Sequence, residues 1–173
     1  MKINRLYFKK LCEEITEPEI SILLGARQVG KSTLMHQLER QAQSKGYKTA
    51  FYDLEQSADL HELSGGPGEV IEKLTTSAKV IFIDEFHYSK KGGKNLKYLF
   101  LFFPNKKIII SGSSALDLTV KAIKFLVGRV VVFQLLPFSF SEYLKVKNEK
   151  LYEIYQDWNS LKVNNKIINQ WKA

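Results

Sequence analysis

The feature that most constrains the fold is the stretch GARQVGKST, residues 25–33, which matches the pattern G-x-x-x-x-G-K-[ST]. Glycines in this pattern let backbone N–H groups turn inward around a phosphate, while the lysine and the hydroxyl reach the phosphates and Mg²⁺. The stretch follows the apolar segment ISILL (20–24) and precedes a helical pattern, which is the context of a P-loop. We predict a nucleotide-binding loop of Gly25, Ala26, Arg27, Gln28, Val29, Gly30, Lys31, Ser32 and Thr33.

A second carboxylate motif, VIFIDE (80–85), closes a later apolar segment. Asp84 is predicted to hold Mg²⁺ together with Ser32, and Glu85 to polarise the attacking water as a general base. One strand-and-helix unit, 47–78, separates this segment from the P-loop helix. An added strand and a glutamate after the aspartate are typical of the ATPase branch of P-loop proteins. We therefore expect ATP and Mg²⁺ as ligands.

Apolar runs of strand length alternate with helical patterns along the chain, which predicts an α/β fold with three α/β/α layers and a five-stranded, mainly parallel sheet. The strands are expected at 20–24, 47–53, 79–84, 107–111 and 130–135. The helix after the P-loop should stop at Gly46, and a later helix at Pro104. Ser139 and Glu142 form a capping-box pattern that predicts one last long helix.

Composition and charge indicate the cellular location and the binding partners to expect. Cys12 is the only cysteine of the 173 residues, and no apolar run reaches the roughly 18 residues of a membrane span, so a soluble cytoplasmic protein without a membrane partner is expected. The net charge is +8, and residues 90–107 hold six lysines and no acid. This basic run predicts either a contact with nucleic-acid phosphates or a solvated face. The lysines proposed for that contact are Lys90, Lys91, Lys94 and Lys97.

Five motifs together resemble a known family. They are LGARQVGKSTL (24–34), FIDEFH (82–87), ISGSSA (110–115), LVGR (126–129) and LPFSFSEYL (136–144). The chain resembles the AAA-type ATPases, in particular a prokaryotic group that usually pairs this domain with a C-terminal domain of unknown function. The resemblance implies the strand order 5-1-4-3-2, an AAA-type P-loop ATPase domain with an N-terminal helix at 1–138, and a helical remnant, a partial lid, at 139–173.

The resemblance also implies roles for two further residues. The strand that ends in ISGSS should lie between the strands of the P-loop and of Asp84, and a hydroxyl there resembles a γ-phosphate sensor. We prefer Ser113 for this role, with Ser111 as the alternative. Arg129 stands where AAA-type proteins place an arginine finger, which would act in trans in a homo-oligomer; the alternative is an arginine that caps a helix C-terminus.

Three functions compete. The first is a Mg²⁺-dependent ATPase that couples hydrolysis to remodelling of a partner, with Lys31, Asp84, Glu85, Ser113 and Arg129 as its catalytic residues. The second is a catalytically weak ATP-binding module. The third is a helicase-type nucleic-acid motor, because residues 84–87 spell D-E-x-H. Helicases of that class close the nucleotide between two tandem domains, whereas 173 residues hold one, so the first function is preferred.

Overall fold

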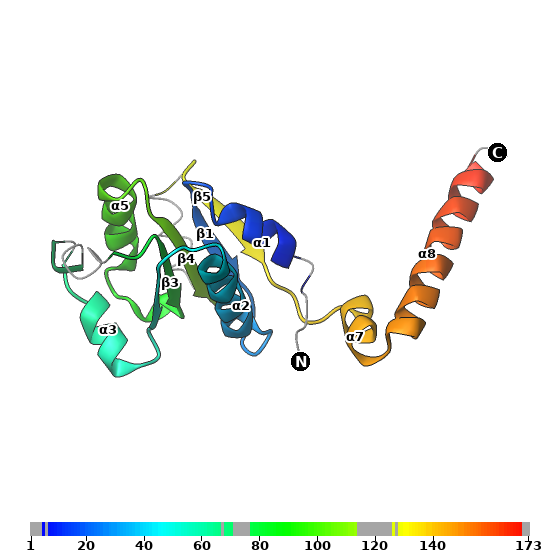
Figure 1. Ribbon diagram of the computed structural model, residues 1–173, viewed down its shortest axis with the longest axis horizontal. Helices are drawn as coiled ribbons and strands as arrows, with labels where there is room; N and C mark the ends of the chain where they lie inside the picture. Colours follow the sequence, from blue (N-terminus) through cyan, green and yellow to red (C-terminus); the bar gives the residue numbers. More distant parts are fainter. Residues whose placement is uncertain are drawn as a thin grey trace. The chain divides into compact units, whose positions relative to one another are not determined.

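A computed structural model describes residues 5, 7–66, 68–70, 77–113, 126 and 128–170, with the side chains placed up to residue 160 (Figure 1). The chain forms two compact units. One unit is Tyr7–Pro137, and the other is Phe138–Ala173 together with Met1–Leu6. The P-loop and the carboxylate motif both lie in the first unit.

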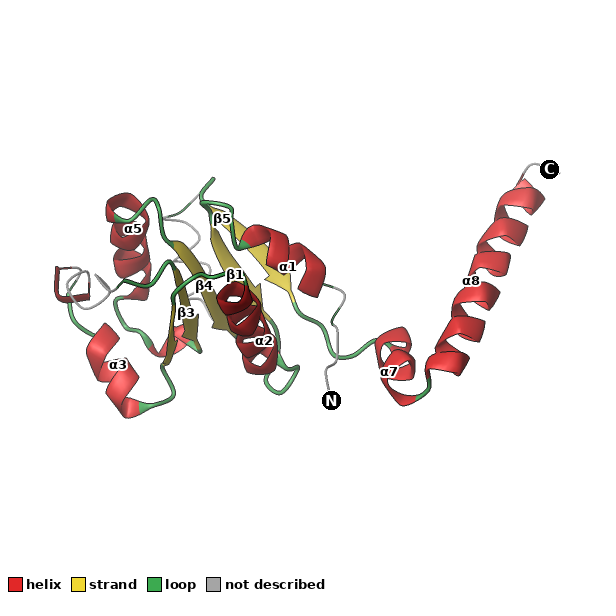
Figure 2. Ribbon diagram, in the orientation of Figure 1, coloured by secondary structure: helices red, strands yellow, loops and turns green. Residues whose placement is uncertain are grey.

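Five parallel strands form the middle layer of the unit Tyr7–Pro137 (Figure 2). The strands are β1 (Ile20–Leu24), β2 (Thr49–Asp53), β3 (Val80–Asp84), β4 (Lys107–Gly112) and β5 (Val130–Gln134). Their order is β2-β3-β4-β1-β5, which is the predicted order 5-1-4-3-2 read in reverse. The predicted fold class and strand order are therefore confirmed.

Helices cover both faces of the sheet (Figure 1). On one face lie α1 (Phe8–Glu14) and α2 (Lys31–Ser44), and on the other α3 (Ser57–Leu63) and α5 (Gly92–Phe102). Alternate residues of β3 show why both faces are needed: Phe82 packs with Leu34 of α2, whereas Ile83 packs in the cluster that contains Leu96 of α5. A parallel sheet that is apolar on both faces must be covered on both, and this gives the three layers.

The ends of the helices follow the local sequence. Helix α2 ends at Ser44, and Gly46 adopts φ 83° just beyond it, which is the left-handed conformation that a glycine provides after a helix. Helix α5 ends at Phe102, two residues before Pro104. Both helices stop where the sequence predicts.

The second unit contains α7 (Phe140–Lys147) and α8 (Glu149–Gln170). Ser139 and Glu142 form the predicted capping box, and Glu142 also lies 3.3 Å from Arg5 Nε. The prediction of a single long helix is wrong: the chain leaves the helix at Asn148 (φ −158°), whose side chain accepts the N–H of Leu151 and starts α8. Asparagine favours such caps because its side chain replaces a missing backbone partner.

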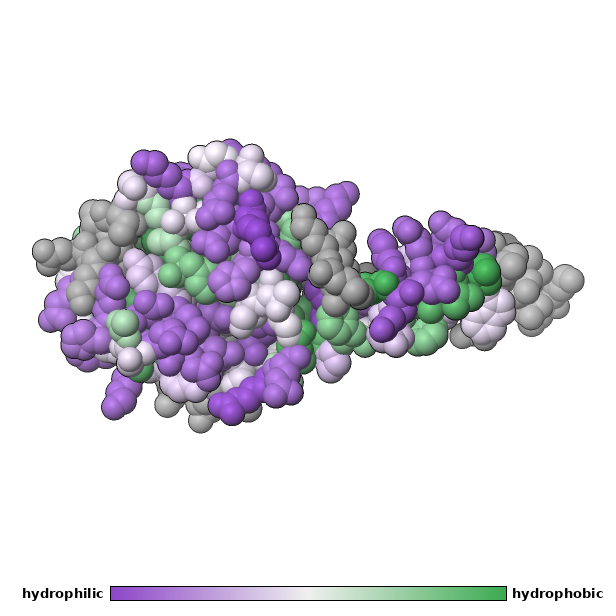
Figure 3. Space-filling view, turned by 60° about the horizontal axis from the view of Figure 1, so that its bottom comes forward, coloured by the Kyte–Doolittle hydropathy of each residue, from purple (hydrophilic) through white to green (hydrophobic). Residues whose placement is uncertain are grey.

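The surface of this second unit carries large apolar side chains, visible as green patches around α7 and α8 in Figure 3. Phe140, Tyr143, Ile154 and Trp158 are each more than half exposed. Among the described residues, no helix is both long and apolar enough to cross a membrane.

Two lysines of the basic run have structural roles at the amino edge of the sheet. Lys107 is buried; its Nζ donates to the carbonyl oxygen of Glu19 at 2.6 Å and lies 3.8 Å from Glu14 Oε2. Lys106 Nζ donates to the carbonyl oxygen of Ala78 at 2.8 Å. These contacts tie β4 to the segments that precede β1 and β3, so neither lysine belongs to a freely solvated face.

Burial lowers the pKa of Lys107 to about 8, although Glu14 and other nearby glutamates oppose the shift. An unfolded lysine titrates at about 10.4, so between pH 8 and that value the unfolded chain binds more protons, and this group makes the fold more stable as the pH rises. We expect the free energy of unfolding of wild type minus that of Lys107→Met to increase between pH 7.5 and 9.5. Urea titrations measure it, with Lys48→Met as an exposed control; a constant difference would contradict the expectation.

Candidate nucleotide site

Parallel pairing brings the ends of three strands to one edge of the sheet. Leu24 of β1 is paired with Gly112 of β4, and Ile83 of β3 is paired with Ile110. The N–H of Gly25 continues this pairing by donating to the carbonyl oxygen of Gly112 at 3.3 Å. The P-loop, the end of β4 and Asp84 therefore lie side by side at the carboxyl edge, where open α/β sheets bind ligands.

The P-loop folds back on itself between β1 and α2. Gln28 (φ 64°) and Gly30 (φ 92°) both adopt left-handed backbone conformations, which turn the chain sharply into the first turn of α2. Ser32 and Thr33 stand exposed in that turn. The N–H groups of a helix start carry partial positive charge, so the loop presents the polarity that a phosphate requires.

The buried cation of the site is Lys31, only 4% exposed. Its Nζ donates to the carbonyl oxygens of Gly25 at 3.2 Å and Ala26 at 3.1 Å, and lies 3.6 Å from Glu85 Oε1. A buried ammonium group is tolerated only where such partners replace water. The loop carbonyls and Glu85 thus hold the charge of Lys31 inside the loop.

Asp84, Glu85 and Ser111 form a second hydrogen-bonded group. Asp84 is buried at the end of β3, and the hydroxyl of the buried Ser111 donates to its Oδ1. The N–H of Glu85 is shared between Asp84 Oδ1 at 3.0 Å and Ser111 Oγ at 3.1 Å. These bonds hold Glu85 at φ 48°, a left-handed conformation that costs a non-glycine residue of order 1 kcal/mol or more.

The strained backbone turns the Glu85 side chain between two basic groups. Oε1 faces Lys31, and Oε2 lies 3.0 Å from Nδ1 of His87, although off the direction of a hydrogen bond. His87 belongs to the short 3-10 turn η1 (Phe86–Tyr88) and its ring lies against that of Tyr88, at 4.3 Å between centroids. The sequence reading gave His87 no role in the site. His87 is the last residue of the D-E-x-H match, but its contact with Glu85 depends on a turn that this pattern does not predict.

The two residues with implied roles lie in different places. Ser113 directly follows β4, level with Gly25, and is half-buried. Arg129 lies at the opposite, amino edge, where its carbonyl oxygen accepts the N–H of Ile20 at 3.0 Å and its guanidinium lies 5.3 Å from the ring centre of Phe100. The helix expected before Arg129 falls largely on residues outside those described. A five-residue strand spans about 17 Å, so Arg129 is remote from the P-loop of its own chain.

The residues at the carboxyl edge suit a magnesium ion chemically. Ser32 offers an exposed hydroxyl and Asp84 a carboxylate, and Mg²⁺ binds oxygen ligands, usually with waters and substrate phosphates completing the shell. The path of the loop itself depends on Gly25, because a Cβ at this position would stand 2.5 Å from the carbonyl oxygen of Leu135 and 2.9 Å from Val29 Cγ2. The loop follows a path that only glycine permits.

Comparison with known proteins matches this geometry to a family. A family model described as an AAA domain matches residues 17–144, which is more than half of the chain. The chain belongs to this AAA domain family. The resemblance inferred from the five motifs is thereby confirmed, and the family and fold are those of ATP-binding P-loop proteins.

Individual relatives of this AAA domain are distant. A protein of Haemophilus influenzae is 27% identical over 173 residues, covering 88% of this chain and 42% of its own length. A crystal structure of a DNA replication initiation factor superposes with a TM-score of 0.57 at 18% identity, covering 84% of this chain and 49% of that one. AMPPCP-bound DnaA from Aquifex aeolicus gives a TM-score of 0.56 at 17% identity, with the same two coverages. The AAA domain thus spans about half the length of these proteins or less.

The crowding at Gly25 predicts a costly substitution. Gly25→Ala should lower the free energy of unfolding by about 1–3 kcal/mol, because the backbone of Leu135 cannot move away without breaking its bond to Leu24. Gly68→Ala is the matched control, since nothing lies within 4 Å of a Cβ there. Urea denaturation measures both variants, and equal stability of the two would contradict the close approach.

Proposed function

We propose that this AAA domain is a Mg²⁺-dependent ATPase that hydrolyses ATP to ADP and phosphate and couples the reaction to remodelling of a partner. The observation that carries the proposal is the cluster of Lys31, Asp84 and Glu85 at the carboxyl edge, with Glu85 in a strained backbone conformation beside the P-loop lysine. Strain of this kind persists only where the surroundings enforce it, and it gathers at functional sites.

Lys31 would change partners when ATP binds. Its three protons now face two carbonyl oxygens and one carboxylate oxygen, all within the loop and its neighbour Glu85. The β- and γ-phosphates carry more negative charge than these carbonyls and would draw the ammonium group toward them. Binding of ATP would therefore separate Lys31 from Glu85.

That separation prepares Glu85 for its role. With Lys31 turned to the phosphates, Oε1 becomes free to accept a proton from the attacking water, while His87 stays near Oε2 and Ser111 keeps the backbone in place. Ser32 and Asp84 would hold Mg²⁺, which would supply positive charge against the negative charge that develops on the phosphates. The carboxylate thus acts as a base only when ATP is present.

Ser113 remains the proposed γ-phosphate sensor. Its position one residue beyond β4 and level with Gly25 supports this role, because a side chain there lies at the edge that the phosphates approach. Ser111 lies two residues earlier, within β4, and is already bonded to Asp84 and Glu85, which supports a role in holding the two acidic residues.

Substitutions of Lys31 and Glu85 separate binding from hydrolysis. Lys31→Ala should abolish detectable ATP binding, whereas Glu85→Gln should bind ATP and hydrolyse it about 100-fold or more slowly, since general bases contribute that much. Calorimetry with ATP and a phosphate-release assay measure the two effects. Wild-type turnover in Glu85→Gln would remove the base assignment. A wild-type protein that binds ATP stoichiometrically without turnover would instead be the weak ATP-binding module.

Arg129 is proposed to act in a neighbouring subunit of a homo-oligomer. Its place at the amino edge, away from its own P-loop, supports a contact in trans, and in doing so the guanidinium would leave the ring of Phe100.

Mixing two inactive variants tests this arrangement. Arg129→Ala and Lys31→Ala should each lose about 1000-fold or more of the ATPase rate, and an equal mixture should recover about a quarter of the wild-type rate, because a quarter of the subunit pairs combine an intact loop with an intact arginine. The phosphate-release assay measures recovery after co-refolding. No recovery, with both variants folded and oligomeric, would show that Arg129 acts only as a structural residue.

Nucleic acid is proposed as a further partner, through Lys90, Lys91, Lys94 and Lys97. All four lysines are exposed; Lys90 and Lys91 lie just before α5, and Lys94 and Lys97 lie within it. This exposure supports a contact with phosphates.

A further inference from the structure

The outer surface of α5 carries more than lysines. Tyr98, Leu101 and Phe102 are 41%, 50% and 61% exposed on its C-terminal half. The rings of Tyr98 and Phe102 lie parallel, with an interplanar angle of 3° and centroids 5.9 Å apart. We call Lys90, Lys91, Lys94, Lys97, Tyr98 and Phe102 the α5 face. Two of its lysines lie just before α5 and two within it, and all four precede the two exposed aromatic rings along the chain.

The charge of the α5 face is uncompensated within the described part of the chain. Residues 86–113 contain no Asp or Glu, and no carboxylate among the described residues forms an ion pair with any of the four lysines. Lys106 and Lys107, which complete the basic run in sequence, are instead bonded to backbone carbonyls at the amino edge. The structure therefore separates four exposed lysines from two structural ones.

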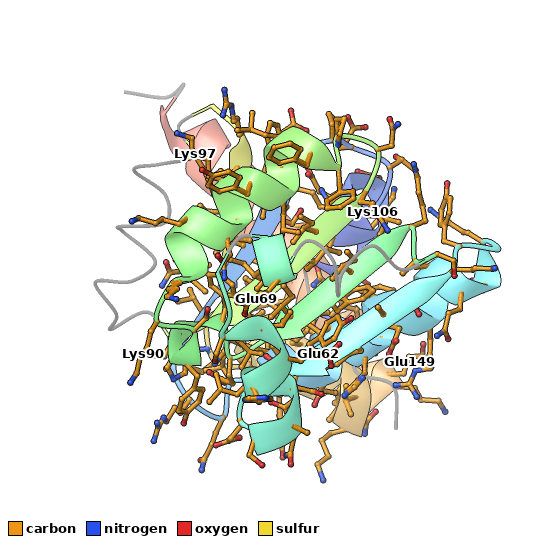
Figure 4. All side chains as sticks on the ribbon, turned by 90° about the vertical axis from the view of Figure 1, so that its left-hand side faces the viewer. Glu62, Glu69, Lys90, Lys97, Lys106 and Glu149 are labelled. Atoms are coloured by element: carbon orange, nitrogen blue, oxygen red, sulfur yellow. The ribbon has the colours of Figure 1, made fainter. Side chains whose placement is uncertain are left out.

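The lysines and the ATP site are close in the chain. Lys90 is the fifth residue after Glu85, and the intervening turn η1 exposes Tyr88 at 36%. Figure 4 shows the side chains of Lys90 and Lys97 on the same side of this unit, reaching outward. Helix α5 has 11 residues and spans about 16 Å at 1.5 Å per residue. A ligand along it would be several phosphates long.

From these features we propose that the α5 face binds single-stranded nucleic acid, with the lysines along the phosphate backbone and unstacked bases on the rings of Tyr98 and Phe102. Exposed aromatic rings stack with any base, and lysines neutralise phosphates without reading sequence. A duplex keeps its bases stacked inside and offers only its phosphates. The inference rests on the phosphate contact proposed above and adds the class of nucleic acid, while it is independent of ATP hydrolysis.

The charge component is tested with a fluorescein-labelled 12-nucleotide thymidylate strand, by anisotropy between 50 and 200 mM salt without ATP. Four neutralised phosphates predict a slope of log affinity against log salt of about −2.8, and each Lys→Gln change on the α5 face should flatten it by about 0.7. Lys147→Gln, an exposed lysine of α7, is the matched control and should leave the slope unchanged. A wild-type slope near zero, or no binding at 50 mM salt, overturns the proposal.

The stacking component is tested with Phe102→Ala and Phe102→Leu, each measured on the thymidylate strand and on an abasic strand of the same length. Loss of the ring should weaken thymidylate binding about 5- to 150-fold and leave abasic binding unchanged. Phe140→Ala removes an equally exposed phenylalanine of the other unit and should have no effect. Equal weakening on both strands, or no weakening, overturns base stacking.

Three further measurements distinguish the other ligands. A uridylate strand that binds as well as thymidylate fits the proposal, because neither contact reads the sugar. A 12-residue polyglutamate that competes equally well, with Phe102→Leu retaining affinity, would show an acidic protein partner instead and overturn it. So would a duplex that binds as tightly as the single strand. Lys31→Ala should keep strand binding while losing ATP, and Phe102→Ala should keep ATP binding, so failure of either proposal leaves the other testable.

Discussion

The ammonium group of Lys31 lies buried against the carbonyl oxygens of Gly25 and Ala26 and the carboxylate of Glu85. A buried charge without such partners would cost several kcal/mol, so the path of the loop and the position of Glu85 are linked to this one group. The loop must bend inward to bring its carbonyls to Nζ, which requires the left-handed turn at Gly30. The end of β3 must bring Glu85 across β4, which the parallel pairing of β1, β4 and β3 achieves.

Ser111 shows how the strand between these two motifs takes part. It occupies β4, and its hydroxyl reaches both Asp84 and the N–H of Glu85. Without it, the strained turn at Glu85 would lose one of its two hydrogen-bond acceptors. The middle strand is thus a structural support for the acidic pair as well as a spacer in the sheet.

Much of the fold could be predicted from sequence because its signals are local. Apolar runs, the P-loop glycines and Gly46 each constrain the backbone within a few residues, and the observed strands begin and end within two residues of their predicted bounds. The strand order came from the resemblance to a family, since pairing between distant parallel strands leaves no local pattern. The break at Asn148 was missed because the capping-box pattern marks where a helix starts, and the interruption depends on the asparagine side chain starting a second helix.

In the site, too, residue types could be predicted from the sequence, whereas side-chain contacts could not. Residue types predicted Lys31, Asp84 and Glu85 as a group, and the structure places them together. The contact of His87 with Glu85 and the split of the basic run depend on side-chain direction in three dimensions. Lys106 and Lys107 have the same charge as Lys97 but bind backbone carbonyls, because they stand at the start of a buried strand, whereas Lys97 lies on the exposed side of a helix. The sequence analysis also made no prediction for Tyr98 and Phe102, whose exposure depends on how α5 packs on the sheet.

Helix α5 runs between the two edges of the sheet, from the carboxyl edge with Glu85 to the amino edge with Arg129. Arg129 packs on Phe100 of α5, and the lysines of α5 begin five residues after Glu85. One helix thus contacts the proposed finger near its C-terminal half and follows the proposed base at its N-terminal end. A ligand that shifts α5 would act on both groups at once, because a packed helix moves as a unit and does not deform residue by residue. The packing of Arg129 on α5 offers a physical route by which a nucleic-acid strand bound to the proposed α5 face would change the rate of ATP hydrolysis.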